Sequence, residues 1–279
     1  MTKTVLVTGC SSGLGRNTAL GFAAAGWNVV ATMRRPEQLP QGSFPVGVLV
    51  QPLDVMDPQS ARAAIDVAVQ HFGALDALVN NAGVSILSIF ETTSPDAIRR
   101  VFDTNVFGAM NVTQAAIPAL RQSRGVVVNV SSGVGFAAVP LLSLYVASKH
   151  ALEGFSESVA YELESQHIRV RLVEPGAMRT TAFSANTVEA TSSAPVPDGY
   201  RAYFDQALGA MLNYPFADTS EQSVVDAILA AANDTSARLR YPVGPDVAEY
   251  ARLRWTTSED EYAAGMSRLV GQTAWRDGK

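Results

Sequence analysis

The sequence predicts an α/β fold in which helices cover both faces of a parallel sheet. From residue 4 to residue 173, short apolar runs suited to buried strands alternate with segments whose apolar residues recur at helical intervals. Hydrophobic residues make up 47% of the 279 residues and charged residues 17%, which gives ample apolar surface for one extended core. We therefore expect a single domain over residues 1–279.

The first unit is a strand, a glycine turn and a helix. Residues 4–8 form an apolar run, residues 13–25 show helical periodicity, and Gly26 ends that helix. Further strands are expected at residues 28–33, 46–51, 75–79, 126–130 and 169–173, and helices at 57–72, 94–122 and 143–165. Residues 34–45 are rich in Pro, Gly and Gln, so we expect an abbreviated crossover there.

The alternation lapses over residues 183–218, where prolines and a glycine stand among aromatic residues. Such an insertion is expected to be either a mobile cover over a substrate pocket or a structural segment that packs its aromatic residues for stability. A helix at 220–233 and a last strand at 238–241 follow. The extension 245–279 carries Trp255, Tyr262 and Trp275 among charges, and is expected to dock on the body or on a neighbouring subunit.

Composition argues against several classes of protein. The formal net charge is -5 and no Lys or Arg run forms a track for nucleic acid, so we expect no nucleic-acid partner. The lone Cys10 and three His residues offer neither an internal disulfide nor a metal site, which suits a reducing cytoplasm. No signal-like segment follows Met1 and no run reaches eighteen apolar residues, so we expect a soluble cytoplasmic protein without a membrane partner.

The turn from Thr8 to Gly15 predicts a site for a dinucleotide. Backbone N–H groups and the positive end of a helix dipole meet an anion there, and glycines let the backbone approach a pyrophosphate. Its spacing is Gly-x-x-x-Gly-x-Gly, and an ordinary tight turn is the alternative. The expected contacts are Gly9, Ser11, Ser12, Gly13, Leu14 and Gly15.

The end of the second strand indicates which dinucleotide binds. A carboxylate at this place would bind the ribose 2′-hydroxyl of NAD, but the strand ends in Met33, Arg34 and Arg35. A guanidinium binds a 2′-phosphate with charge-assisted hydrogen bonds, so Arg34 and Arg35 predict NADP rather than NAD. Solvated surface arginines are the alternative.

Two further segments follow strands of the same sheet. Asp54 is expected to accept a hydrogen bond from the adenine amino group, with Val55 beside it, although a turn or capping aspartate is the alternative. Asn81, Ala82 and Gly83 lie at the carboxyl edge, where ligands of such sheets bind, and an ordinary Asn-Gly turn is the alternative there.

Tyr145 and Lys149 are four residues apart, so on a helix they share one face. An ammonium favours the ionised form of a neighbouring phenol, which predicts a group suited to proton transfer. By itself the pattern also fits a surface Tyr and Lys. Ser132 lies thirteen residues upstream of Tyr145, directly after an apolar run.

Together these motifs resemble the short-chain dehydrogenase/reductase family of the classical type over residues 4–181. The segments that carry the resemblance are Thr8 to Gly15, Asn80 to Gly83, Asn105, Ser132, Tyr145, Lys149 and Pro175-Gly176. The family implies a Rossmann-type doubly wound fold, a nicotinamide cofactor and reversible hydride transfer between a carbonyl and an alcohol. The residues Ala31-Thr32-Met33-Arg34 and the extended C-terminus look closest to the 17β-hydroxysteroid-dehydrogenase-like branch.

The resemblance also implies roles for residues. Tyr145 would protonate the carbonyl oxygen or take the hydroxyl proton in reverse, and Lys149 would lower the pKa of Tyr145 and hold the nicotinamide ribose. Ser132 would hydrogen-bond the substrate oxygen, with Ser131 as the competing candidate. Asn105 would bind a water in a proton relay; without the family, it would be a polar helix residue.

The segment after the sixth strand is the last expected cofactor contact. By resemblance, Pro175, Gly176, Met178 and Thr180 would lie on the carboxamide side of nicotinamide, with Thr180 as the hydrogen-bonding member.

These expectations combine into a functional hypothesis. The protein is expected to be an NADP-dependent oxidoreductase for a lipophilic carbonyl or secondary alcohol. An NAD-dependent alcohol dehydrogenase, or a non-catalytic dinucleotide sensor, is the alternative. The family implies a homodimer or homotetramer formed through the segments 94–122 and 143–165.

Overall fold

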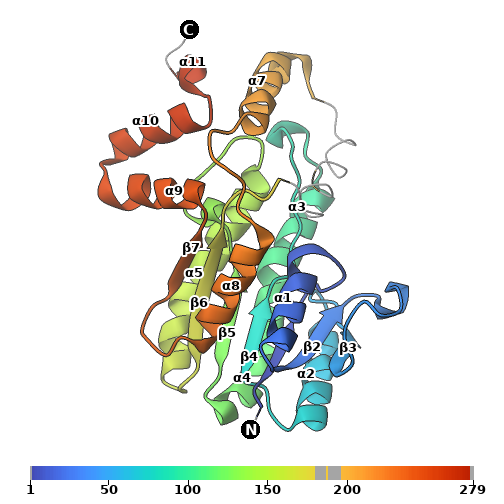
Figure 1. The fold of residues 1–279 in the computed structure, drawn as a ribbon. Helices are drawn as coiled ribbons and strands as arrows, with labels where there is room; N and C mark the ends of the chain where they lie inside the picture. The colour runs from blue at the N-terminus through green and yellow to red at the C-terminus, as the bar shows by residue number, and fades with distance from the viewer. Residues whose placement is uncertain (1, 180–186, 188–195, 277–279) are drawn as a thin grey trace.

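A computed structural model describes residues 2–179, 187 and 196–276. Its centre is a parallel sheet of seven strands in the order β3-β2-β1-β4-β5-β6-β7 (Figure 1). The strands are β1 Thr4–Val7, β2 Asn28–Met33, β3 Val48–Pro52, β4 Ala77–Asn80, β5 Val126–Val130, β6 Arg169–Pro175 and β7 Arg240–Val243. The predicted doubly wound α/β fold is confirmed.

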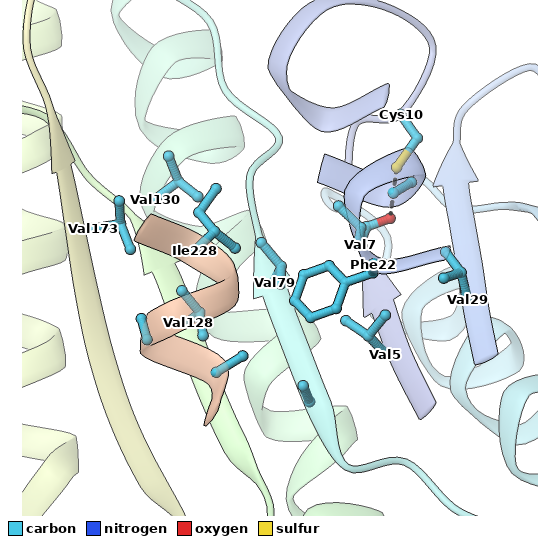
Figure 2. Packing of buried hydrophobic residues seen from close by; sticks show 14 of the residues in the cluster. Val5, Val7, Cys10, Phe22, Val29, Val79, Val128, Val130, Val173 and Ile228 are labelled. Carbon is cyan, nitrogen blue, oxygen red and sulfur yellow. Dashed lines mark hydrogen bonds between the residues drawn. The ribbon is translucent and has the colours of Figure 1, made fainter. Parts of the chain in front are cut away.

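Helices cover both faces of this sheet because side chains along each strand point alternately to the two faces. Helices α1 Gly13–Ala24 and α8 Glu221–Asn233 pack on the face that carries Val5 and Val7. Figure 2 shows Phe22 of α1 and Ile228 of α8 among the strand valines. Helices α2 Pro58–Phe72, α4 Gly108–Ser123 and α5 Ser143–Glu164 pack on the opposite face.

The chain between β4 and β5 departs from the single helix expected over residues 94–122. It forms α3 Pro95–Phe102, a π-helical turn η3 Asp103–Phe107, and then α4. The turn contains Asn105, whose side chain bonds to backbone and side-chain groups outside this helix. Local periodicity could not signal this break, because the partners that stabilise it are distant in sequence.

The crossover over residues 34–45 is abbreviated, as predicted, and contains only the short 3-10 helix η1 Pro36–Gln38 as regular structure. The expectation of an irregular segment over 183–218 was wrong for part of it, because α7 Arg201–Leu212 is a regular helix. Ala207 of α7 packs against Leu87, Ile89 and Leu141, which lie outside the sheet, so this helix packs on loops and not on the strands. Residues 183–186 and 188–195 lie outside the described residues.

The extension after β7 docks on the body of the molecule. It forms α9 Pro245–Thr256, α10 Glu259–Leu269 and the short α11 Thr273–Arg276. Val247 and Tyr250 of α9 pack with Phe136 and Ala137, which follow β5. Figure 1 shows α7, α9, α10 and α11 at one end of the sheet, where β7 ends and α9 begins.

Candidate active site

A cleft of about 1080 Å³ opens at the carboxyl edge of the sheet. The turn after β1 and the loops after β4, β5 and β6 line it, together with residues from α5, α7 and α9. The strand order reverses between β1 and β4, and open parallel sheets bind ligands at such a switch point. The fold therefore places the cleft where a dinucleotide is expected.

The glycine turn forms one wall of the cleft. Gly9 and Gly13 have φ angles of 74° and 52°, which favour glycine. A Cβ on Gly15 would lie 2.3 Å from Gly9 O and 2.4 Å from Asn81 Nδ2, so only glycine fits there. This backbone cradle at the start of α1 suits a pyrophosphate, and the residues present therefore fit a dinucleotide.

Most of the residues predicted to bind the cofactor line this cleft. They are Gly9, Ser11, Ser12, Gly13, Leu14, Gly15, Arg34, Asp54, Val55, Asn81, Ala82, Gly83, Tyr145, Lys149, Pro175, Gly176 and Met178. Arg35 is not among the lining residues; it is exposed and lies directly before η1. Thr180 lies outside the described residues.

Hydrogen bonds join the glycine turn to the loop after β4. Thr8 Oγ1 accepts bonds from the backbone N–H groups of Asn81 and Ala82, both at 3.0 Å, and Asn81 Nδ2 donates to Thr8 O at 2.9 Å. Asn80 Nδ2 donates to Asn129 Oδ1 on β5 and to Thr113 Oγ1 on α4. These contacts hold the turn and the loop at a fixed separation across the switch point.

The far end of the cleft holds Arg34 and Asp54. The Arg34 side chain is exposed at the end of β2, and no ion pair of Arg34 occurs among the residues described. Asp54 Oδ1 accepts a bond from Met56 N at 3.0 Å, so this residue stabilises a turn while it also lines the cleft. Both interpretations of Asp54 thus remain compatible with its position.

Ser132, Tyr145 and Lys149 come together at the inner wall. Ser132 Oγ donates to Pro175 O at 3.3 Å and accepts a bond from Val134 N at 3.3 Å. Lys149 Nζ donates to Val130 O, the last carbonyl of β5, at 2.7 Å and lies 5.6 Å from the centre of the Tyr145 ring. Helix α5 therefore presents both side chains to the end of β5.

Burial sets the proton affinities of this pair. It raises the pKa of Tyr145 to about 12, against a smaller opposing effect of the hydrogen bond with Ser132. Burial also lowers the pKa of Lys149 to about 8, and the negative charge of Glu153 opposes that shift. The net shift of the Tyr145 pKa is thus opposite to the one expected from the Tyr–Lys spacing, because loss of solvent outweighs the hydrogen bond with Ser132.

Asn105 is buried behind this pair in the π-helical turn. Its Nδ2 donates to Val84 O at 2.8 Å and to Ser148 Oγ at 3.0 Å, and its Oδ1 accepts from Val84 N at 2.8 Å. Both amide hydrogens are therefore used by the protein, and only the second lone pair of Oδ1 could receive a water. The side chain primarily connects the loop after β4 to α5.

Asp246 is a site residue that sequence reasoning missed. Its Oδ2 accepts a bond from Ala177 N at 2.8 Å, while its Oδ1 is buried without a hydrogen-bond partner among the described residues. Asp246 therefore fixes the loop after β6 from the start of α9. No local signal marks it, since its partner is 69 positions away in the sequence.

The remaining wall of the cleft comes from α7, the residues after it and the C-terminal extension. Met211 and Tyr214 line it, and so do Tyr250 and Val270. The Tyr214 and Tyr250 hydroxyls are hydrogen-bonded to each other. The described part of the 183–218 insertion thus contributes to the pocket, and the extension does so as well.

Neither a metal cluster nor a membrane span was found in the part of the chain that the structure describes. No group of three or more His, Cys, Asp or Glu residues there could hold a metal ion. No helix there combines the length and the apolar character needed to cross a bilayer.

Known proteins match this architecture. The family described as "short chain dehydrogenase" matches residues 3–191. An uncharacterized oxidoreductase of Schizosaccharomyces pombe is 35% identical over 86% of this chain and 100% of its own length. A short-chain dehydrogenase from Streptomyces avermitilis superposes with a TM-score of 0.79 at 29% identity, covering 100% of this chain and 98% of that one.

A second solved structure, a short chain dehydrogenase from Burkholderia cenocepacia, was determined in complex with NADP. It has a TM-score of 0.76 and 25% identity, and the match covers 95% of this chain and 98% of that chain. The chain described here belongs to the short-chain dehydrogenase/reductase family. It is thus an oxidoreductase of this family with a site for a nicotinamide dinucleotide.

Proposed function

We propose that this protein is an NADP(H)-dependent oxidoreductase that interconverts a carbonyl compound and a secondary alcohol. One observation carries the proposal: Ser132, Tyr145 and Lys149 lie together on the wall of the same cleft that the glycine turn lines. This arrangement puts proton-transfer groups beside the expected position of a nicotinamide. The alternative of a non-catalytic sensor gains no support, since the three side chains are all present.

Tyr145 and Ser132 have different roles in carbonyl reduction. NADPH, when bound, supplies the hydride that reaches the carbonyl carbon. The phenol of Tyr145 donates a proton to the carbonyl oxygen, and its pKa of about 12 keeps it protonated near neutral pH. Ser132 donates a hydrogen bond to the same oxygen and orients it. In alcohol oxidation, Tyr145 accepts the hydroxyl proton instead.

The cleft supports a lipophilic substrate. Beyond Tyr145, its lining includes Val139, Leu142, Met211 and Val270, while the paired hydroxyls of Tyr214 and Tyr250 supply polar groups. Pockets of this kind bind apolar ligands and orient them with a few polar contacts. We therefore propose a ketone or secondary alcohol with a bulky apolar part.

Substitution of Tyr145 by Phe tests the reaction. With a panel of apolar ketones and NADPH, we expect the reductase kcat of Tyr145→Phe to fall by about 10²–10⁴-fold, because the proton donor is lost. NADPH affinity, measured by fluorescence titration, should change little. A variant that reduces a good substrate as fast as the wild type would overturn the mechanism.

Substitution of Arg34 by Ala tests the cofactor preference. A hydrogen bond to a charged group contributes about 1.5–3 kcal/mol, so Arg34→Ala should raise the Kd for NADPH by about 10–100-fold. Its affinity for NADH should stay the same. Arg35→Ala is the matched control, because Arg35 lies outside the cleft. A wild-type protein that binds NADH more tightly than NADPH would instead support the NAD-dependent alternative.

A further inference from the structure

A buried cluster of charged side chains lies one helical turn beyond Lys149. Glu153 of α5 and Glu174 of β6 both contact Nη1 of Arg240 on β7, with 2.5 Å between this nitrogen and Glu153 Oε2. The Glu174 side chain is fully buried and that of Glu153 is 6% exposed. We call Glu153 and Glu174 the acid pair. Buried carboxyl groups need partners or a shared proton, so this arrangement requires an explanation.

Glu153 of the acid pair lies near the candidate catalytic centre. Lys149 Nζ is bonded to Val130 O, and the next residue, Ser131, faces Glu153 across Gly135. A Cβ on Gly135 would lie 2.7 Å from Ser131 Oγ and 2.9 Å from Glu153 Oε1, so glycine leaves room for these two groups. The charge of Glu153 acts on Lys149 from this position.

The pair cannot carry two full negative charges beside one guanidinium. Burial and the nearby charge of Glu153 together raise the pKa of Glu174 to about 8, against the opposing effect of Arg240. Burial raises the pKa of Glu153 as well, while the charges of Arg240 and Lys149 lower it. Because Glu174 is the more deeply buried of the two and Glu153 lies nearer to Lys149, we assign the proton of the pair to Glu174 and the negative charge to Glu153. The Arg240 guanidinium, which also contacts Glu157 at 2.6 Å, neutralises this charge only in part because it is shared among three carboxyl groups.

Four charged or titratable groups surround Glu153: Lys149 and Glu157 on its own helix, Glu174 from β6 and Arg240 from β7. Burial alone would drive Lys149 towards the neutral amine, and a neutral amine could not stabilise negative charge at Tyr145. A negative charge one turn away counters that effect.

We propose that Glu153 is a positioning residue whose charge keeps Lys149 protonated during the reaction proposed above, with Glu174 and Arg240 holding that charge in place. Glu153 acts through Lys149 and does not touch the substrate. The inference thus rests on the proposed function for its catalytic meaning. The effect of Glu153 on the titration of Lys149 can be measured without turnover.

The sequence makes this measurement simple, since it contains only three lysines: Lys3, Lys149 and Lys279. Protein labelled with ¹³C at the lysine ε-carbon gives one signal for each, and Lys149→Met assigns the signal of interest. We expect Lys149 in the cofactor-free wild type to titrate near pH 8. In Glu153→Gln, its titration should move down by about one pH unit, the lower end of the effect of a neighbouring charge.

Two matched variants separate this role from a structural one. Glu174→Gln resembles the protonated acid, so the Lys149 titration should stay close to that of the wild type. Glu157→Gln removes the half-exposed contact of Arg240 and should affect thermal stability without moving the Lys149 signal. A Glu153→Gln protein that folds and leaves the Lys149 titration unchanged would overturn the proposal. If Glu153→Gln does not fold, the test passes to Glu174→Gln. A downward shift of the Lys149 titration in that variant would also overturn the proposal, because it would show that Glu174 carries the negative charge.

The reductase pH profile then distinguishes the two proposals. If the alkaline fall in kcat moves to lower pH in Glu153→Gln together with the NMR titration, both are supported. If reductase activity depends on Tyr145 but the Lys149 titration is unchanged in Glu153→Gln, the proposed function is supported and the inference is refuted. A shifted Lys149 signal in a protein without reductase activity would refute the function and leave the effect of Glu153 on Lys149 in place.

Discussion

Burial shifts the pKa values of Tyr145 and Lys149 in opposite directions. Burial disfavours the charged form of each, so the phenol holds its proton more tightly and the ammonium less tightly. Near neutral pH, both groups are therefore protonated, which is the state that carbonyl reduction requires. The distance along the helix could predict that the two residues meet, but it could not predict their loss of solvent.

The proton affinity of Lys149 gives a testable pH dependence. Lys149 is charged below its pKa of about 8 and neutral above it, whereas Tyr145 stays protonated to about pH 12. Reductase kcat should therefore fall as the pH rises through about 8. In Lys149→Arg, whose guanidinium does not titrate in this range, the rate should be lower but this alkaline fall should disappear. A fall at the same pH in Lys149→Arg would assign it to another group.

At the scale of elements, the glycine turn shows how closely the chain approaches itself. Gly15 packs against Gly9 O and Asn81 Nδ2, and the loop after β4 is bonded to Thr8. The sequence predicted the turn and its place between β1 and α1 from local signals alone. The contact with Asn81 required the tertiary fold, because 66 residues separate it from Gly15.

Gly15→Ala should therefore disturb both the turn and its ligand. Overpacking of this kind costs about 1–3 kcal/mol, so we expect a lower Tm and a weaker affinity for NADPH. Gly154→Ala on α5 is the control: a Cβ there meets no atom within 4 Å, and replacing a helical glycine should stabilise by about 0.5–1 kcal/mol. Unchanged NADPH binding in Gly15→Ala would show that the turn does not hold the cofactor.

The elements that sequence reasoning missed share one property. The break in the helix expected over 94–122 depends on Asn105 reaching Val84 and Ser148, and α7 packs on loops above the sheet. In both places, partners distant in sequence override the local pattern. Strands and helices that pack directly on the sheet, such as β2, β5 and α1, were predicted to within a residue because their apolar period reflects that packing.

At the scale of the whole molecule, we propose that copies of this chain associate through α4 and α5. Tyr161 on α5 is 80% exposed, and Phe107, directly before α4, is 53% exposed. Large exposed aromatic residues favour association when they lie in a shared apolar patch. The family resemblance supports a homodimer or homotetramer.

Light scattering after size-exclusion chromatography tests this association. We expect the wild type to elute as a dimer or tetramer and Tyr161→Asp to shift towards smaller species, because a charge in an apolar interface is costly. Phe90→Asp is the control, since Phe90 is exposed outside both helices. A wild-type protein that is monomeric at micromolar concentration would contradict the proposal.

The sequence by itself determined the parallel sheet covered on both faces, the glycine turn and the shared face of Tyr145 and Lys149, because these features follow from periodicity and from short spacings. The doubly wound fold and the place of Ser132 beside Tyr145 were implied by the family resemblance, since Ser132 is thirteen residues from Tyr145 in the sequence. Only the tertiary structure decided that Glu153, Glu174 and Arg240 share a buried site and that Asp246 holds the loop after β6. A carboxylate one turn from a lysine ordinarily lies in water. It becomes a buried charge here because β6 packs against α5 and Arg240 of β7 contacts it, and burial is what lets that charge act strongly on a neighbouring group.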